Sequence, residues 1–149
     1  WEPPAYSPLT KLFYVTERNG YSIYYLTDPD PRGSMGLGGK EEVSVGSTGS
    51  FLTAIDPTTG KIAWRRPYTS VPGGFGGGGG GGLLTTAGNL VFAGDAGGNF
   101  VAYDAENGTP LWHSRIGNVS NAAITYMLDG RQHILVAAGD TLYAFALYE

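Results

Sequence analysis

A four-residue pattern occurs twice in this chain, and its spacing restricts the possible fold more than any other feature. The first copy is Ala54, Asp56, Gly60 and Trp64, and the second copy is Ala102, Asp104, Gly108 and Trp112. Each residue of the second copy lies 48 positions after its counterpart. Repeats of roughly 20–50 residues are typical of arrays, solenoids and propellers, in which each repeat is one supersecondary unit. A chain of 149 residues therefore has room for about three such units.

The residue types of the pattern predict a strand, a tight turn and a return strand. Each Asp opens a turn in which its carboxylate can accept hydrogen bonds from backbone N–H groups two or three residues later. Each Gly supplies the positive φ that ends the turn. Each Trp places a large flat side chain on the return strand, where it can be buried between neighbouring sheets. We interpret both copies as structural and not catalytic.

The composition supports a β structure and excludes several functional classes. Aromatic residues make up 13% of the chain and charged residues 15%, which suits buried sheets better than helices. With 9 basic and 13 acidic residues and no basic stripe, the chain lacks the surface that a nucleic acid would bind. It contains no Cys, which excludes disulfides and thiolate zinc sites but leaves the compartment open. No apolar run approaches about 18 residues, so we expect no membrane span.

The N-terminal region predicts one hairpin between two irregular segments. Three prolines in residues 1–8 exclude a helix and a central strand, so we expect a loop there. Aromatic and β-branched residues predict strands at 12–16 and 21–27. The Asn19-Gly20 pair between them is typical of a type I′ turn. Residues 28–40 carry turn-forming residues throughout, which indicates a surface excursion.

The rest of the chain predicts antiparallel units joined by tight turns. Strands are expected at residues 51–55, 61–65, 83–86, 89–93, 99–104, 110–113, 122–128, 133–138 and 142–146. The second unit thus has four strands, the size of a propeller blade. We place the blade-like units at about residues 5–70, 81–117 and 119–148. The fold class predicted from these patterns is an all-β propeller of four-stranded antiparallel blades.

A weaker similarity links the second unit to the third. Residues 91–94 align with residues 136–139, and residues 100–102 align with residues 142–144. The third unit has no copy of the Gly-x-x-x-Trp segment, so its sheet is predicted to lack the fourth strand. Such a sheet exposes unpaired backbone groups, which proteins normally cover. We therefore expect this chain to be the closing part of a longer ring.

A glycine tract separates the first unit from the second. Gly73, Gly74 and Phe75 are followed by seven consecutive glycines that end at Gly82. A glycine loop that holds a phosphate needs a strand before it, a helix after it and usually a Lys-Ser/Thr pair, and none of these is predicted here. The remaining interpretations are a mobile loop, or backbone that passes close to a ligand or a neighbouring chain.

Several segments besides the repeated pattern resemble one family, the pyrroloquinoline-quinone (PQQ) dehydrogenases. Residues 1–8 with the strand at 12–15 resemble that family's Asn-Trp-x-Pro segment and its next strand. Residues 83–94 resemble the start of its final complete blade, and residues 130–147 resemble its C-terminal end. The resemblance implies an eight-bladed propeller whose blades are tied together by tryptophan-docking motifs, with this chain as its C-terminal portion.

The resemblance also implies a redox function. Members of this family bind PQQ with a calcium or lanthanide ion, oxidise alcohols or sugars in the periplasm, and pass electrons to a cytochrome c or a quinone. The catalytic Asp and the metal ligands of the family would lie before Trp1. The resemblance therefore implies no catalytic or metal-binding residue in this chain, and it makes the remaining N-terminal blades its principal partner.

Four residues are predicted to contact the cofactor by this resemblance. Trp1 matches a family Trp that lies against PQQ. Gly81 and Gly82 match a Gly-Gly pair that a Trp often precedes in the family, and Gly80 stands at that position here. Phe75 could replace the missing aromatic wall.

Other candidate sites have simpler interpretations. His113 and His133 have no third ligand at metal-binding spacing, so we interpret them as surface or rim histidines. The acidic residues Asp28, Asp30, Glu41 and Glu42 lack the alternating pattern of a calcium loop and indicate a solvated turn. The functional alternative to the dehydrogenase is a non-catalytic propeller with the same repeats that acts as an assembly or interaction scaffold.

Overall fold

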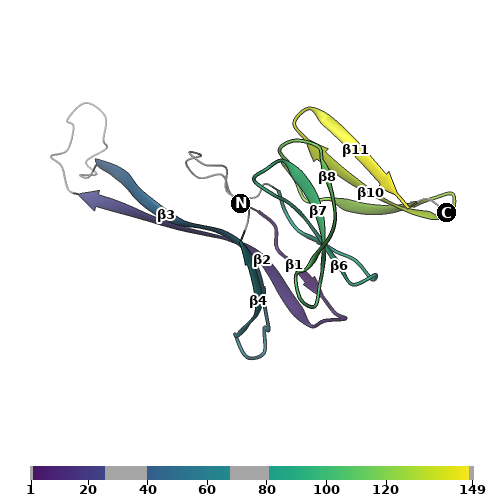
Figure 1. The fold of residues 1–149 in the computed structure, drawn as a ribbon, viewed down its shortest axis with the longest axis horizontal. Coiled ribbons are helices and arrows are strands. Elements are labelled where there is room, and N and C mark those ends of the chain that lie inside the picture. Colours follow the sequence, from purple (N-terminus) through teal and green to yellow (C-terminus); the bar gives the residue numbers. More distant parts are fainter. Residues whose placement is uncertain (1, 26–39, 68–80, 148–149) are drawn as a thin grey trace, which may run out of the picture.

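The computed structural model describes residues 2–25, 40–67 and 81–147, and these residues form three antiparallel β-sheets that follow one another along the chain (Figure 1). The predicted all-β class with antiparallel sheets is confirmed. Within the described ranges, no helix is long and apolar enough to cross a membrane.

The first sheet has four strands in sequential order. They are β1 (Ala5–Ser7), β2 (Leu12–Tyr25), β3 (Lys40–Ile55) and β4 (Ile62–Pro67). The loop predicted for residues 1–8 is wrong at β1, which pairs with β2 through Ala5 opposite Tyr14 and Ser7 opposite Leu12. Because β1 is an edge strand of three residues with prolines only on either side of it, it forms without losing a ladder hydrogen bond.

The type I′ hairpin predicted at Asn19-Gly20 is wrong. Both residues lie within β2, where Asn19 pairs with Gly49 and Gly20 pairs with Ser47. The register shifts at this point, and Gly46 and Gly49 opposite have positive φ, so the Asn-Gly pair marks a bulged stretch instead of a turn. β2 and β3 continue beyond β1 and β4 as a two-stranded ribbon (Figure 1). The surface excursion predicted at 28–40 lies outside the described residues, apart from Lys40, which begins β3.

The second sheet confirms the four short strands predicted for it. They are β5 (Leu84–Thr85), β6 (Leu90–Gly94), β7 (Asn99–Asp104) and β8 (Pro110–Arg115), again in sequential order. The Trp of each repeat faces the Ala of the same repeat on the neighbouring strand, because Ala54 pairs with Trp64 and Ala102 pairs with Trp112. In both sheets a register irregularity follows this pair directly.

The third sheet has three strands, as predicted. They are β9 (Ile124–Leu128), β10 (Arg131–Ala138) and β11 (Thr141–Ala146), in the order β11-β10-β9.

The sequence alignment of β6 with β10 is wrong by two residues. In the second sheet, Ala102 pairs with Phe92. The alignment equates Ala102 with Ala144 and Phe92 with Ala137, so Ala144 should pair with Ala137. It pairs with Leu135 instead. The turn between β10 and β11 has two residues, whereas the turn between β6 and β7 has four, and this difference shifts the register. A shift of two residues keeps the same side chains on each face of the sheet.

The first and second sheets pack through one buried cluster. Its members are Tyr14, Leu52, Ala54, Leu83, Val91, Ala93 and Ala105. The Ala105 carbonyl accepts hydrogen bonds from Trp64 Nε1 (3.0 Å) and from the Tyr14 hydroxyl (2.9 Å), both of which belong to the first sheet. The Trp64 ring also covers Gly108, where an added Cβ would lie 2.7 Å from Cε3 of the indole. One backbone carbonyl thus joins two strands of the first sheet to the second.

The second and third sheets pack through an aromatic cluster. Phe100 stacks on Phe92 and Phe145, and Trp112 packs on Phe145 in a T-shaped arrangement, with ring centroids 5.2 Å apart. Trp112 is 41% exposed, and its indole nitrogen makes no hydrogen bond within the part of the chain that the structure describes. The two tryptophans of the repeat therefore have different surroundings.

Replacing each tryptophan by Phe should show this difference as two different losses in the free energy of unfolding. Trp64→Phe removes a hydrogen bond to a buried carbonyl, so the free energy of unfolding should fall by about 1 kcal/mol more than it does in Trp112→Phe. Urea unfolding followed by circular dichroism measures the difference. Equal losses for the two variants would contradict a specific role for the Trp64 hydrogen bond.

Candidate functional site

The segments that lead into the first strand of each sheet meet at one place. Pro3 precedes β1, Gly82 precedes β5, and Ala122 precedes β9. The Leu83 amide donates to the Pro3 carbonyl (3.0 Å), and the Thr85 hydroxyl donates to the Tyr6 carbonyl (2.9 Å). β1 and β5 therefore lie side by side although some 80 residues separate them. This junction contains the only predicted cofactor contacts that fall within the described residues.

Gly81 and Gly82 allow the backbone to approach its neighbours at this junction. A Cβ on Gly82 would lie 2.6 Å from Pro3 Cγ and 2.7 Å from Ala122 Cβ. A Cβ on Gly81 would lie 2.6 Å from the Asn121 carbonyl oxygen, and Gly81 also has a positive φ of 82°. The space that side chains would occupy is already filled by protein on that side. Close backbone packing is thus sufficient to require glycine at both positions.

Trp1 and Phe75, the other two predicted cofactor contacts, lie outside the described residues. So do Asp28, Asp30 and the side chains of Glu41 and Glu42.

Two carboxylates, those of Glu2 and Asp95, form structural contacts. Glu2 accepts a hydrogen bond from the Thr16 hydroxyl (2.5 Å), and Asp95 closes its own turn by accepting from the Asn99 amide and side chain (both 2.8 Å). Among the described residues, no three His, Cys, Asp or Glu side chains are grouped closely enough to hold a metal ion. The described junction therefore does not provide a metal site.

One ion pair was not predicted from the sequence. Glu17 accepts hydrogen bonds from Arg65 (2.5 Å) and from the Thr53 hydroxyl (2.9 Å). The Arg65 guanidinium lies 3.7 Å from the centroid of the Phe51 ring. Glu17 and Arg65 are 48 residues apart, so only the strand pairing brings them together. The cluster lies on β2, β3 and β4 and reinforces the first sheet.

The two histidines lie in different sheets. His113 is exposed on β8, and His133 on β10 stacks on Tyr126 with ring centroids 5.1 Å apart. The His133 Nδ1 atom lies 3.2 Å from the Arg131 carbonyl. They share no ligand group within the described residues.

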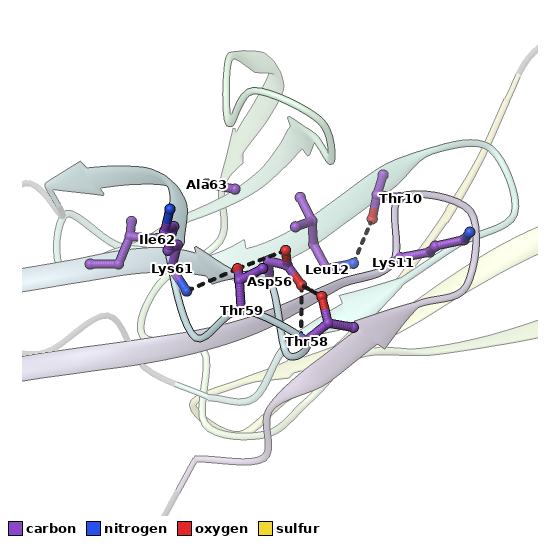
Figure 2. Close-up of a pocket in the computed structure, with 9 residues that line it drawn as sticks. All are labelled: Thr10, Lys11, Leu12, Asp56, Thr58, Thr59, Lys61, Ile62 and Ala63. Atoms are coloured by element: carbon purple, nitrogen blue, oxygen red, sulfur yellow. Dashed lines mark hydrogen bonds between the residues drawn. The ribbon is translucent and has the colours of Figure 1, made fainter.

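A cavity of about 520 Å³ lies at the opposite end of the first sheet, between the turn that follows β1 and the turn that follows β3 (Figure 2). Its lining includes Lys11, Asp56 and Lys61. Asp56 accepts from the Thr58 hydroxyl (2.6 Å), the Thr59 hydroxyl (2.8 Å) and the Thr58 amide (2.8 Å), and these bonds lower its pKa to about 2. A carboxylate held so firmly in its ionised form is a poor proton acceptor, so Asp56 has a structural role.

Buried Tyr14 and partly buried Tyr103 also lack acid–base reactivity near neutral pH. Burial raises the pKa of Tyr103 to about 12, with a further contribution from the charge of Asp95. Burial also raises the pKa of Tyr14, whose hydroxyl donates to Ala105. Both side chains stay protonated and serve the packing between sheets.

Comparison with known proteins gives the family. Residues 36–147 match the PQQ_2 family model, described as outer membrane protein assembly factor BamB. The chain belongs to the PQQ-like repeat family. It is also homologous to the quinoprotein alcohol dehydrogenases, which confirms the resemblance found in its sequence.

Individual relatives define the extent of this homology. The chain is 35% identical to quinohemoprotein alcohol dehydrogenase ADH-IIG of Pseudomonas putida and 35% identical to quinohemoprotein alcohol dehydrogenase of Comamonas testosteroni, in each case over 93% of the chain and 21% of the relative. The solved structure of ADH-IIG matches with a TM-score of 0.74 at 29% identity, over 95% of the chain and 22% of that structure. The Comamonas testosteroni structure matches with a TM-score of 0.72 at 33% identity, over 93% of the chain and 22% of that structure. The three sheets thus correspond to part of a quinoprotein propeller, and the chain spans about a fifth of these relatives' length.

A pair of glycine variants tests the packing at the junction. Gly82→Ala should lower the free energy of unfolding by about 1–3 kcal/mol, because its Cβ would collide with Pro3 and Ala122. Gly88→Ala is the matched control, since its Cβ would have only the Thr86 hydroxyl at 3.7 Å and should change stability by less than about 0.5 kcal/mol. Chemical unfolding measures both. Gly82→Ala with wild-type stability would disprove the close packing of Gly82.

The lowered pKa of Asp56 predicts an acid-dependent loss of stability. The folded-state pKa of about 2 lies below the ordinary Asp value of 3.8, so the contribution of Asp56 is complete above pH 3.8 and is lost as the pH falls to about 2. Thr58→Val should raise the pKa of Asp56, whereas Thr109→Val, in the corresponding turn of the second sheet, should leave it unchanged. NMR titration of the Asp56 carboxyl carbon measures this pKa. An unchanged value in Thr58→Val would exclude the hydrogen bond as its cause.

Proposed function

We propose that this chain is the C-terminal segment of a PQQ-dependent dehydrogenase that oxidises alcohols or sugars in the periplasm and passes the electrons to a cytochrome c or a quinone. In this proposal the residues form about three blades of one larger propeller, and the remaining blades complete it. The observation that carries the proposal is the combination of 35% identity with a TM-score of 0.74 to quinohemoprotein alcohol dehydrogenase ADH-IIG over nearly the whole chain.

The described residues do not by themselves fit the cofactor. Gly81 and Gly82 face Asn121, Pro3 and Ala122 where a Cβ would point, and no metal-binding group of three side chains occurs in the described ranges. We therefore derive no catalytic step from this chain. The proposal assigns the catalytic Asp, the metal ligands and most of the cofactor contacts to the rest of the polypeptide.

In such an enzyme, this chain would contribute blades that form one wall of the cofactor pocket. Trp1, Phe75, Gly81 and Gly82 are the proposed cofactor-facing positions. PQQ would supply the two-electron chemistry with a calcium or lanthanide ion, and the protein would supply position and electrostatics. The tight junction of Pro3, Gly82 and Ala122 would keep this wall rigid.

A second candidate is a propeller of the same repeats that acts as an assembly or interaction scaffold. It is favoured by the matching family model, whose description is that of an outer membrane protein assembly factor. In that case the same three sheets would offer a binding surface and no redox site.

Cofactor binding to the complete polypeptide separates the two candidates. For the dehydrogenase, PQQ with Ca²⁺ at about 100 times the dissociation constant should stabilise the protein by about 2.7 kcal/mol and raise its melting temperature. Adding an alcohol should then reduce an artificial electron acceptor. PQQ alone and Ca²⁺ alone are the controls. No melting shift and no alcohol-dependent reduction at saturating cofactor would reject the dehydrogenase and favour the scaffold.

A further inference from the structure

The dipeptide Asn-Gly occurs twice in the chain, as Asn19-Gly20 and as Asn107-Gly108. An Asn in such a pair can lose its side-chain amide without a catalyst. The backbone nitrogen of the next residue can reach the side-chain carbonyl carbon, and glycine has no side chain to obstruct this approach. One pair lies within β2 and the other in the turn between β7 and β8. The chain thus places one reactive local sequence in two different surroundings.

The surroundings of Asn107 oppose this reaction. The Gly108 nitrogen, which would be the attacking atom, donates to the Asp104 carbonyl at 2.8 Å. The Asn107 side-chain oxygen accepts from the Thr109 amide, also at 2.8 Å. Gly108 is buried, and an added Cβ there would lie 2.7 Å from the Trp64 ring. Ring closure at Asn107 therefore requires both hydrogen bonds to break beside an indole that already fills the space.

The surroundings of Asn19 offer less resistance. The ladder between β2 and β3 changes register between Asn19 and Gly20. Gly20 is exposed, and among the described residues a Cβ added to it would have only the Gly46 oxygen within 4 Å, at 3.8 Å. The pair lies on the ribbon in which β2 and β3 continue beyond β1 and β4 (Figure 1). A two-stranded ribbon is only marginally stable in water, so the backbone at Asn19 is held less firmly than that at Asn107.

We propose that Asn19 is a site of spontaneous deamidation in the folded protein. The Gly20 nitrogen attacks Cγ of Asn19 and loses its proton to solvent, the Cγ–Nδ2 bond breaks, and the side-chain nitrogen leaves as ammonia. Water then opens the resulting cyclic imide at either carbonyl, which yields aspartate or isoaspartate. No electrons are transferred, and water is the only co-reactant.

The products change the ribbon in two ways. Isoaspartate routes the main chain through the former side chain, so β2 gains one backbone carbon before Gly20 and its pairing with β3 beyond that point must shift. Either product adds a negative charge two positions after Glu17, and alternate residues of a strand share a face. Both changes weaken the ribbon and leave the buried cluster between the first and second sheets intact.

Ageing of the complete polypeptide tests this proposal without any cofactor, and therefore independently of the redox function. The folded protein is incubated at a fixed temperature, and peptide mass spectrometry follows the amide-to-acid conversion at both Asn-Gly pairs. Asn19 should convert at least about tenfold faster than Asn107, a barrier difference of about 1.4 kcal/mol, which is on the scale of one hydrogen bond. The control is the same protein in urea, where the two pairs should react at similar rates. Equal rates in the folded protein, or faster conversion at Asn107, would overturn the proposal.

Two variants test the attacking atom and the product. Gly20→Ala fits the available space, and its methyl group should slow conversion at Asn19 by about tenfold without affecting Asn107. Conversion at the wild-type rate in Gly20→Ala would overturn attack by the residue 20 nitrogen. Asn19→Asp supplies the charge without the extra backbone carbon, so amides of the ribbon should exchange faster with solvent in the aged wild-type protein than in Asn19→Asp. Equal exchange would contradict isoaspartate as the product.

Discussion

The structure depends on one backbone carbonyl that accepts two hydrogen bonds across a sheet interface. Trp64 and Tyr14 lie on different strands of the first sheet, and both donate to Ala105 in a turn of the second. Because a buried carbonyl without a partner is costly, this arrangement fixes the position of the turn as well as the rotamers of two large aromatic side chains. Gly108 then allows the indole to lie flat against the turn. The buried apolar residues around the Ala105 carbonyl then pack in the geometry that these two hydrogen bonds fix.

The parts of the fold that could be predicted from the sequence are those encoded locally. The Asp-to-Gly turns, the four short strands of the second sheet and the three strands of the third sheet all follow from turn residues and alternation. The errors occur where a distant segment decides the outcome. Asn19-Gly20 has the composition of a hairpin turn, but β3 offers β2 a partner along its whole length and the chain continues straight. The register of β10 depends on a turn length that residue similarity alone does not reveal.

The candidate site was predictable only in part, for the same reason. The glycine tract was expected to be a mobile loop or backbone close to a ligand or a neighbouring chain, and its last two glycines lie close to other segments of the same chain. Their neighbours are Pro3, Asn121 and Ala122, which lie about 80 positions earlier and about 40 positions later in the chain, and no local pattern connects these segments. The Glu17–Arg65 ion pair could not be predicted, because two single charges 48 residues apart form no sequence pattern and meet only when the strands pair. Family membership, in contrast, could be predicted from the sequence. The Asp-Gly-Trp repeat that builds the interfaces is also the most distinctive pattern in the chain.

The ribbon formed by the far ends of β2 and β3 has a consequence for how the protein opens. Beyond Phe51 of β3, each strand of the ribbon has only the other as a partner among residues 2–25, 40–67 and 81–147, and Tyr21 and Ile23 there are 59% and 54% exposed. Separating the two strands at this point breaks backbone hydrogen bonds but disturbs neither of the buried clusters between sheets. The ribbon is therefore a separate unit of local unfolding, whose amides exchange with solvent at a lower free energy than those of the sheet from which it extends.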